Sequence, residues 1–238
     1  MIVYGRNPVH EALRGPRSVS QVWATSNAAR EPWLTQAGVR VAVAPADQIA
    51  VRCGSEAHQG VCAEVSAYRY AEADQLLGVG QALILALDQV QDPQNLGAIC
   101  RSAECAGAAG VVLTERRSAE VTAAVCKASA GAVEHLRVAR VRNLTDFLTA
   151  AKAGGFWCYG ADAGAELDYR RVDFAGPVVL VMGSEGSGLR PRVAAACDAL
   201  VSLPLRGRIG SLGVGAGAAV MLYAAAAARD RPPLDSGF

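Results

Sequence analysis

The 238-residue sequence has no excess of charge of either sign, because 23 Lys and Arg stand against 22 Asp and Glu, for a net charge of +1. No global feature therefore points to nucleic acid, and contact with a polyanion has to come from local basic patches. The seven cysteines are odd in number and scattered, with no C-x-x-C pair. This pattern excludes a disulfide framework and a zinc site, and it predicts a reducing, cytoplasmic environment without a bound metal.

Strongly apolar long segments are also lacking. Residues 209–228 carry no charge and are long enough to span a bilayer, but they are mostly Ala and Gly, which insert poorly. We expect a glycine loop leading into an alanine-rich helix that is buried against protein, with no membrane association. A secretory signal is not expected either, since Arg6 and His10 precede any apolar core. The composition, 52% hydrophobic and 19% charged, is that of a folded globular chain.

Two glycine-rich segments lie close together near the C-terminus. The apolar run PVVLV at 177–181 leads into GSEGSGL at 183–189, and LPLRGRIGSL follows at 203–212. Glycine has no Cβ, so such segments let a flat ligand lie against bare backbone. The alternative is that they are two tight turns at strand ends.

Alternating strand and helix patterns over residues 81–238 predict an α/β domain with a mostly parallel sheet and helices on both faces. Ligands of such sheets gather at the carboxyl ends of the strands, so both glycine segments and the turn at 92–95 should meet at one edge. Residues 1–66 predict a smaller α/β unit, in which Asn7 caps a helix, and residues 67–80 a linker. The strands expected in the larger domain are 82–87, 110–114, 136–141, 156–159, 178–182 and 200–203. The helices expected between them are 96–106, 119–130, 144–153, 190–196 and 214–228.

The two glycine segments resemble the second and third motifs of the SpoU/TrmH family of the SPOUT superfamily, which are S-adenosylmethionine-dependent RNA 2′-O-ribose methyltransferases. YGRNPV at 4–9 and HQG at 58–60 resemble the ends of the ribosomal-protein-like substrate-binding domain (L30e type) of the rRNA branch. The resemblance implies a C-terminal trefoil knot, a homodimer, and an rRNA (or tRNA) substrate, with a large-subunit rRNA guanosine as the expected target.

The segment NLGAICR at 95–101 resembles the first motif of this family, in which the asparagine and the arginine line the site. The resemblance makes Asn95 and Arg101 catalytic residues and gives the arginine the role of general base. A guanidinium keeps its proton in proteins. We therefore expect Arg101 to stabilise the developing alkoxide and orient it for attack, with Gly97 leaving space beside it. The alternative for Arg101 is an ion pair with Glu104.

The remaining site residues follow from the same resemblance. Glu185 and Ser211 are expected to be catalytic, Glu185 by positioning Arg101 or receiving a proton and Ser211 by binding phosphate or supporting its loop. The alternative for Glu185 is a helix cap or an ion pair with Arg190. The residues expected to bind the cofactor S-adenosyl-L-methionine, mainly through their backbone, are Gly183, Leu203, Ile209 and Leu212. Those expected to bind RNA are Arg6, His58, Gln59 and Lys127, and the alternatives are a solvated surface or, for the N-terminal residues, a turn hydrogen bond.

The chain departs from the family pattern at two positions. The third motif of the family reads Ser-Leu-Asn-Val-Ser, whereas this chain has Gly213 and Gly215 in place of the asparagine and the second serine. Loss of a polar group from a preorganised site costs on the order of tenfold to a thousandfold in rate. A second function therefore stays open, that of an RNA- or ribosome-binding homologue with weak or no methyl transfer.

Overall fold

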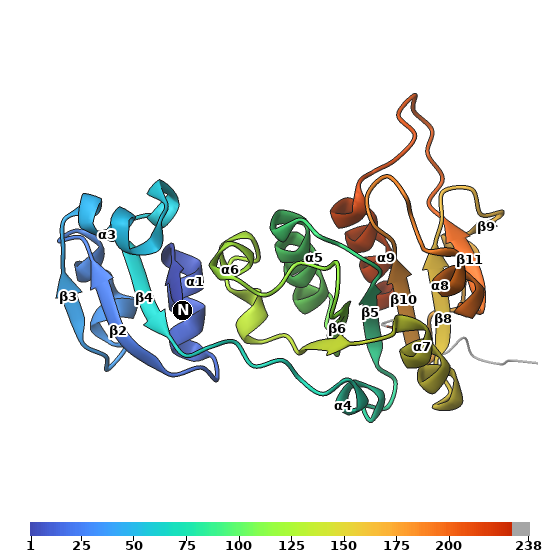
Figure 1. Ribbon diagram of the computed structural model, residues 1–238, viewed down its shortest axis with the longest axis horizontal. Coiled ribbons are helices and arrows are strands. Elements are labelled where there is room, and N and C mark those ends of the chain that lie inside the picture. The colour runs from blue at the N-terminus through green and yellow to red at the C-terminus, as the bar shows by residue number, and fades with distance from the viewer. Residues whose placement is uncertain (230–238) are drawn as a thin grey trace, which may run out of the picture.

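The computed structural model describes residues 1–229, which form two units, each built on its own sheet (Figure 1). The N-terminal unit has four strands in the order β1-β4-β2-β3, of which β2 and β3 are parallel and the other neighbours antiparallel. Its strands are β1 (Ile2–Tyr4), β2 (Val19–Ala24), β3 (Val41–Val43) and β4 (Val61–Val65). Its helices are α1 (Arg6–Arg14), α2 (Pro32–Thr35) and α3 (Ala46–Cys53).

The larger unit has a seven-stranded sheet in the order β7-β6-β5-β10-β8-β11-β9, and every neighbouring pair is parallel. This confirms the α/β class that the sequence predicts. The strands are β5 (Leu83–Leu87), β6 (Gly110–Thr114), β7 (Val138–Val141), β8 (Trp157–Ala161), β9 (Leu167–Asp168), β10 (Val178–Met182) and β11 (Ala199–Ser202). β10 enters the sheet between β5 and β8, although β6 to β9 precede it in the chain.

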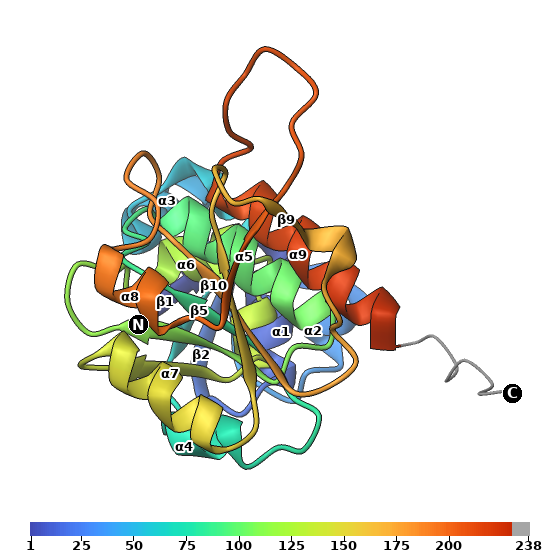
Figure 2. The ribbon, with the colours of Figure 1, turned by 90° about the vertical axis from the view of Figure 1, so that its right-hand side faces the viewer.

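Helices cover both faces of this sheet. One face carries α5 (Pro93–Cys105), α6 (Ala123–Ala128) and α9 (Val214–Arg229), and the other carries α4 (Ala73–Leu77), α7 (Leu144–Ala153) and α8 (Pro191–Ala196). Figure 2 shows α5 and α9 side by side on one face and α7 on the other. The central strands β5, β6 and β10 are buried at every position. Such strands need apolar side chains on both faces, which explains their unbroken apolar sequences.

Local sequence signals explain several element boundaries. Asp92 caps α5, because its carboxylate accepts a hydrogen bond from the Gln94 amide at 3.0 Å and Pro93 occupies the first helical position. The expectation for α1 is wrong by two residues. Its N-cap is Gly5, at φ 97°, rather than Asn7, so the turn before the helix depends on backbone freedom and not on a side-chain cap.

Residues 67–80 do more than connect the two units. They contain α4, and Ala71 runs parallel to β7, donating its amide to the Val138 carbonyl at 2.9 Å. Within residues 1–229 no helix combines the length and the apolarity that crossing a bilayer requires.

Candidate functional site

A cleft of about 530 Å³ opens at the carboxyl end of the large sheet, where the segments after β10 and β11 meet. The segment after β11 projects beyond the body of the unit, drawn in orange and red in Figure 1, and residues 204–213 are all exposed. Three of the predicted cofactor-binding residues, Gly183, Leu203 and Leu212, line this one cleft. The other apolar side chains of its lining are Ala161, Ala163, Met182, Val201, Leu205 and Val214.

The glycine loop after β10 folds back on itself. The amide of Ser184 donates to the Gly188 carbonyl at 3.1 Å, and the amide of Gly188 donates to the Ser184 carbonyl at 3.0 Å. A Cβ on Gly183 would overlap the backbone of Gly188, and Gly186 and Gly188 have φ of 85° and 65°. Only glycine tolerates this combination at low cost, so the loop presents bare backbone to the cleft.

Asp88, at the end of β5, anchors the far side of the same loop. Its carboxylate is buried and accepts hydrogen bonds from the Arg190 amide at 2.9 Å and from the Arg190 Nε at 2.7 Å. This role of Asp88 was not predicted from the sequence. The available signal was an aspartate directly after a fully apolar strand, a position where a charge needs a partner.

Two predicted catalytic side chains, Asn95 and Glu185, line a second hollow of about 310 Å³. Glu185 also lines the cleft, so it stands where the two spaces adjoin. The alternative reading of Glu185 is wrong, since Arg190 pairs with Asp88 and is itself the N-cap residue of α8. The polar groups of Asn95 and Glu185 are thus available to a ligand.

The two unusual glycines face these polar groups. A Cβ on Gly213 would lie 3.5 Å from Oε1 of Glu185, and one on Gly215 would lie 3.4 Å from Oδ1 of Asn95. The side chains missing from the third motif would therefore have contacted both predicted catalytic residues.

The two other predicted residues of this loop differ in position. Ser211 lines the cleft and is exposed at its rim. The side chain of Ile209 is 76% exposed and lies outside the lining of the cleft. The side chain of Ile209 therefore does not contribute to the cleft, and only its backbone could contact a cofactor.

Arg101 does not join the cleft of its own chain. It is exposed on α5 and lines a separate groove of about 690 Å³ between the two units, together with Asn7, Glu11 and Arg14 of α1. The expected open space at Gly97 is absent, because Gly97 is buried and a Cβ there would overlap that of Ala128.

Three of the predicted RNA-binding residues meet at the boundary between the units. Gln59 Oε1 accepts hydrogen bonds from Lys127 Nζ at 2.9 Å and from the Arg6 amide at 3.1 Å, while the Arg6 guanidinium pairs with Glu31. Burial lowers the pKa of Lys127. His58 is buried and its Nδ1 accepts from the Gly60 amide at 2.9 Å, which is the turn hydrogen bond of the alternative reading.

All seven cysteines are free. Burial raises the pKa of Cys100 to about 12 and that of Cys126 to about 11, so these thiols stay protonated and unreactive at neutral pH. In the part of the chain that the structure describes, no group of three or more His, Cys, Asp or Glu side chains is arranged to hold a metal ion.

Comparison with known proteins decides the family. The SpoU rRNA Methylase family matches residues 82–223, and the family of RNA 2′-O ribose methyltransferase substrate-binding domains matches residues 2–71. This chain belongs to the SpoU methylase family. A putative TrmH family tRNA/rRNA methyltransferase of Bacillus subtilis, YacO, is 38% identical over 232 residues, which are 93% of either chain.

Solved structures of SpoU methyltransferases share the arrangement of both units. AviRb of Streptomyces viridochromogenes, in complex with AdoMet, superimposes with a TM-score of 0.81 at 25% identity, covering 96% of this chain and 90% of that one. An AdoMet-bound rRNA methyltransferase of Sinorhizobium meliloti gives a TM-score of 0.80 at 27% identity over 94% of this chain and 85% of that one.

Proposed function

We propose that this SpoU family member methylates the 2′-oxygen of an RNA ribose, with S-adenosylmethionine as methyl donor and a guanosine of large-subunit rRNA as target. The observation that carries the proposal is the single cleft lined by Gly183, Leu203 and Leu212, with Glu185 where it adjoins the hollow of Asn95. Two relatives of the same fold have been solved with AdoMet. The free cysteines agree with the cytoplasm as its location.

The cleft fits this cofactor in size and character. Its volume of about 530 Å³ lies within the range of cofactor sites, and its apolar side chains alternate with bare backbone. Backbone groups of Gly183, Leu203 and Leu212 would hold the adenine and the methionine portion. When bound, S-adenosylmethionine supplies a methyl group activated by the positive charge on its sulfur.

The polar residues around the cleft would prepare the ribose. A 2′-hydroxyl is a weak acid, so its proton needs an acceptor and its developing charge needs a donor. The Glu185 carboxylate accepts the proton, Asn95 and Ser211 orient the ribose and its phosphate, and the Arg101 guanidinium stabilises the oxyanion.

The place of Arg101 outside the cleft of its own chain favours a homodimer, in which a second copy supplies this arginine. The face beside α5 carries unpartnered apolar side chains on α9, since Val220 is 38% and Tyr223 is 54% exposed. Exposed apolar and aromatic side chains that a partner would bury are typical of interfaces. The knot implied by the resemblance and the RNA-binding roles of Arg6, Gln59 and Lys127 belong to the same proposal.

Transfer of tritiated methyl groups to rRNA, with calorimetry of cofactor binding, tests the proposal. Wild type should bind S-adenosylmethionine and label the 2′-oxygen of one guanosine. Arg101→Met and Glu185→Gln should each lose about 100-fold or more in kcat while keeping the cofactor Kd within twofold. Lys152→Met, on the exposed surface of α7, serves as the matched control.

Three results would contradict the proposal. Absence of cofactor binding at millimolar concentration, combined with retained rRNA binding, would establish the RNA-binding homologue instead. Labelling of a base rather than a ribose would refute the reaction. Labelling of tRNA alone would refute the proposal that rRNA is the substrate.

A further inference from the structure

The two units share one hydrophobic core. Val3 and Val9 of the N-terminal unit belong to the same buried cluster as Val125, Cys126 and Val133 of the larger unit. Helix α1 packs against the 3-10 turn η3 (Ala132–Glu134), and β1 packs against α6. The N-terminal unit is therefore docked on the larger one and is not a module on a free tether.

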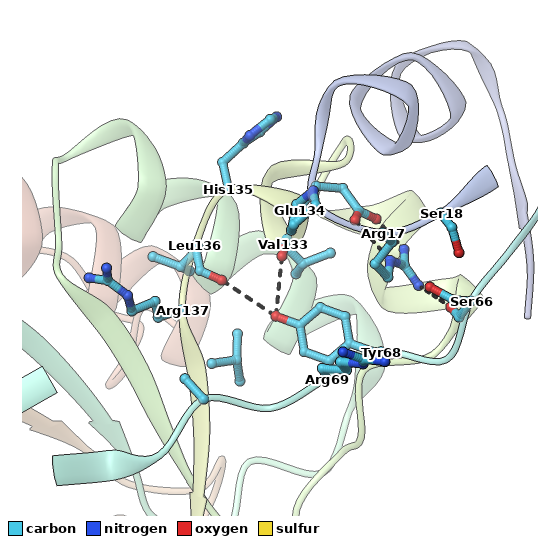
Figure 3. Close-up of a pocket in the computed structure, with 13 residues that line it drawn as sticks. Arg17, Ser18, Ser66, Tyr68, Arg69, Val133, Glu134, His135, Leu136 and Arg137 are labelled. Carbon is cyan, nitrogen blue, oxygen red and sulfur yellow. Dashed lines mark hydrogen bonds and ion pairs between the residues drawn. The ribbon is translucent and has the colours of Figure 1, made fainter. Parts of the chain in front are cut away.

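A buried ion pair lies inside this junction. Arg17, after α1, donates from Nε to Oε2 of Glu134 at 2.8 Å and from Nη2 to Oε1 of the same carboxylate. The side chains of Arg17 and Glu134 are only 6% and 1% exposed. Figure 3 shows the Arg17 guanidinium turned toward Glu134 and the backbone of Ser66.

The guanidinium has further partners on both sides of the junction. Arg17 donates to the Ser66 carbonyl at 3.4 Å and to Sγ of Cys126 at 3.6 Å, and it lies 5.6 Å from the ring centre of Tyr68. Burial acts to lower the pKa of Arg17, but the hydrogen bonds and charge of Glu134 outweigh it and raise that pKa above its usual value. The Arg17 guanidinium therefore keeps its charge at neutral pH.

Tyr68, from the segment between the units, closes the same junction. Its hydroxyl donates to the Val133 carbonyl at 3.2 Å and lies 3.4 Å from the Leu136 carbonyl, as the dashed lines in Figure 3 mark. Gly15 approaches so closely that a Cβ there would lie 2.9 Å from Cβ of Glu134. The hydrogen bonds are directional, and the close packing leaves no room for the units to shift relative to each other. One orientation of the units is therefore favoured.

Such a pair is not explained by stability alone. Replacing a buried ion pair by apolar residues of similar volume is often neutral or stabilising, because desolvation offsets the attraction. A bidentate arginine–carboxylate pair does fix a geometry that apolar contacts leave open. The orientation of the two units is the quantity that this pair can specify.

We propose that the Arg17–Glu134 pair is the positioning element that holds the N-terminal unit at one orientation to the cofactor cleft, and so selects which ribose of a bound RNA enters it. The proposal rests on the methyltransferase function proposed above. A structural path joins the pair to the cleft: η3 follows α6, α6 packs on α5, and α5 carries Asn95 at the edge of the site. Arg17 and Glu134 are positioning residues and contact no substrate.

The double variant Arg17→Met/Glu134→Leu tests the proposal, because it removes the directional bonds and keeps the buried volume. Its thermal midpoint and its Kd for S-adenosylmethionine should stay near those of wild type. Amide exchange in residues 66–71 and 131–136 should rise, and small-angle scattering should show a broader distribution of dimensions. For rRNA, kcat/KM should fall about tenfold or more and methylation should spread to neighbouring riboses, since small misplacements are costly.

Two further variants separate positioning from folding. Arg17→Lys keeps the charge but loses the planar fork, so it should fall between wild type and the double variant in the spread of methylated positions. Lys152→Met breaks an exposed pair with Asp198 away from the junction and should match wild type in every measurement.

The proposal fails if the double variant scatters, exchanges and methylates as wild type does. It also fails if rRNA turnover drops with an unchanged product position and unchanged scattering, or if Arg17→Lys and the double variant lose their fold, because the pair would then serve stability alone. If wild type transfers no methyl group, the function proposed above fails, and scattering and exchange still decide whether the pair sets the orientation.

Discussion

At the scale of single residues, Gly213 and Gly215 stand where the motif that this loop resembles has an asparagine and a serine. Gly213 has φ 72°, a region that asparagine enters more easily than other non-glycine residues. The backbone at position 213 is thus compatible with an asparagine, the residue of the motif that this loop resembles. A Cβ at position 215 would lie at ordinary van der Waals distance from Asn95, so a serine would fit there.

Restoring the two family residues should raise methyl transfer. We expect Gly213→Asn/Gly215→Ser to increase kcat on rRNA about tenfold or more, because both new polar groups would face the predicted catalytic residues Glu185 and Asn95. Single-turnover transfer of tritiated methyl groups measures this. Gly213→Ala is the matched control, since it adds a Cβ at the same φ without a hydrogen-bonding group. A gain of equal size in the control, or a loss in the double variant, would show that the glycines are suited to this chain's own substrate.

At the scale of secondary-structure elements, the contact between α5 and α6 determines where Asn95 and Arg101 stand. Gly97 makes this contact possible, because the two helices touch where it has no side chain. A Cβ at Gly97 would overlap that of Ala128 and would stand 2.9 Å from the Ser129 amide nitrogen. Backbone atoms cannot move aside as a flexible side chain can.

Gly97→Ala should therefore destabilise the protein, although alanine favours an isolated helix. We expect a loss of about 1–3 kcal/mol in the free energy of unfolding from overpacking. Gly217→Ala on α9 is the contrasting substitution, because its Cβ would meet Met182 and Leu203 at 3.5 and 3.7 Å. It should gain about 0.5–1 kcal/mol from helix propensity. Urea unfolding of both variants gives the comparison, and equal effects would refute the packing argument.

The sequence predicted well those elements whose signals are local. The strands 110–114 and 178–182 and the helix 144–153 have the bounds that were expected, and 214–228 falls one residue short of α9. Each of the three with the expected bounds combines an unbroken apolar run, or apolar residues at helical spacing, with a clear boundary. The short elements β1 and α3 were not expected, because they are defined by their pairing and packing within the N-terminal unit.

The glycine segments that line the cleft could be identified from the sequence, whereas side-chain pairs between distant residues could not. A cluster of glycines is visible within a short stretch of sequence, so the segments that line the cleft were found. Asp88 bonds to Arg190, which lies 102 residues further along the chain, and Arg17 bonds to Glu134 at a separation of 117. No pattern within a short window reports such pairs. The outward position of Arg101 was likewise hidden, because it follows from the packing of α5 on α6.

At the scale of the whole molecule, the shared core should make the two units unfold together. Chains of this size with separate domains commonly unfold in steps. Here one buried cluster runs through both units and the Arg17–Glu134 pair lies inside it, so loss of either unit exposes apolar surface of the other.

Tryptophan fluorescence can follow one unit alone and so test this coupling. Trp23 and Trp33 lie in the N-terminal unit, whereas Trp157, on β8, is 57% exposed, and we expect it to tolerate replacement. In Trp157→Phe, fluorescence reports the N-terminal unit and far-ultraviolet circular dichroism reports both. We expect the two signals to give the same urea midpoint and slope. A fluorescence transition at clearly lower urea would show that the N-terminal unit unfolds independently, and the junction would then be a contact surface rather than a common core.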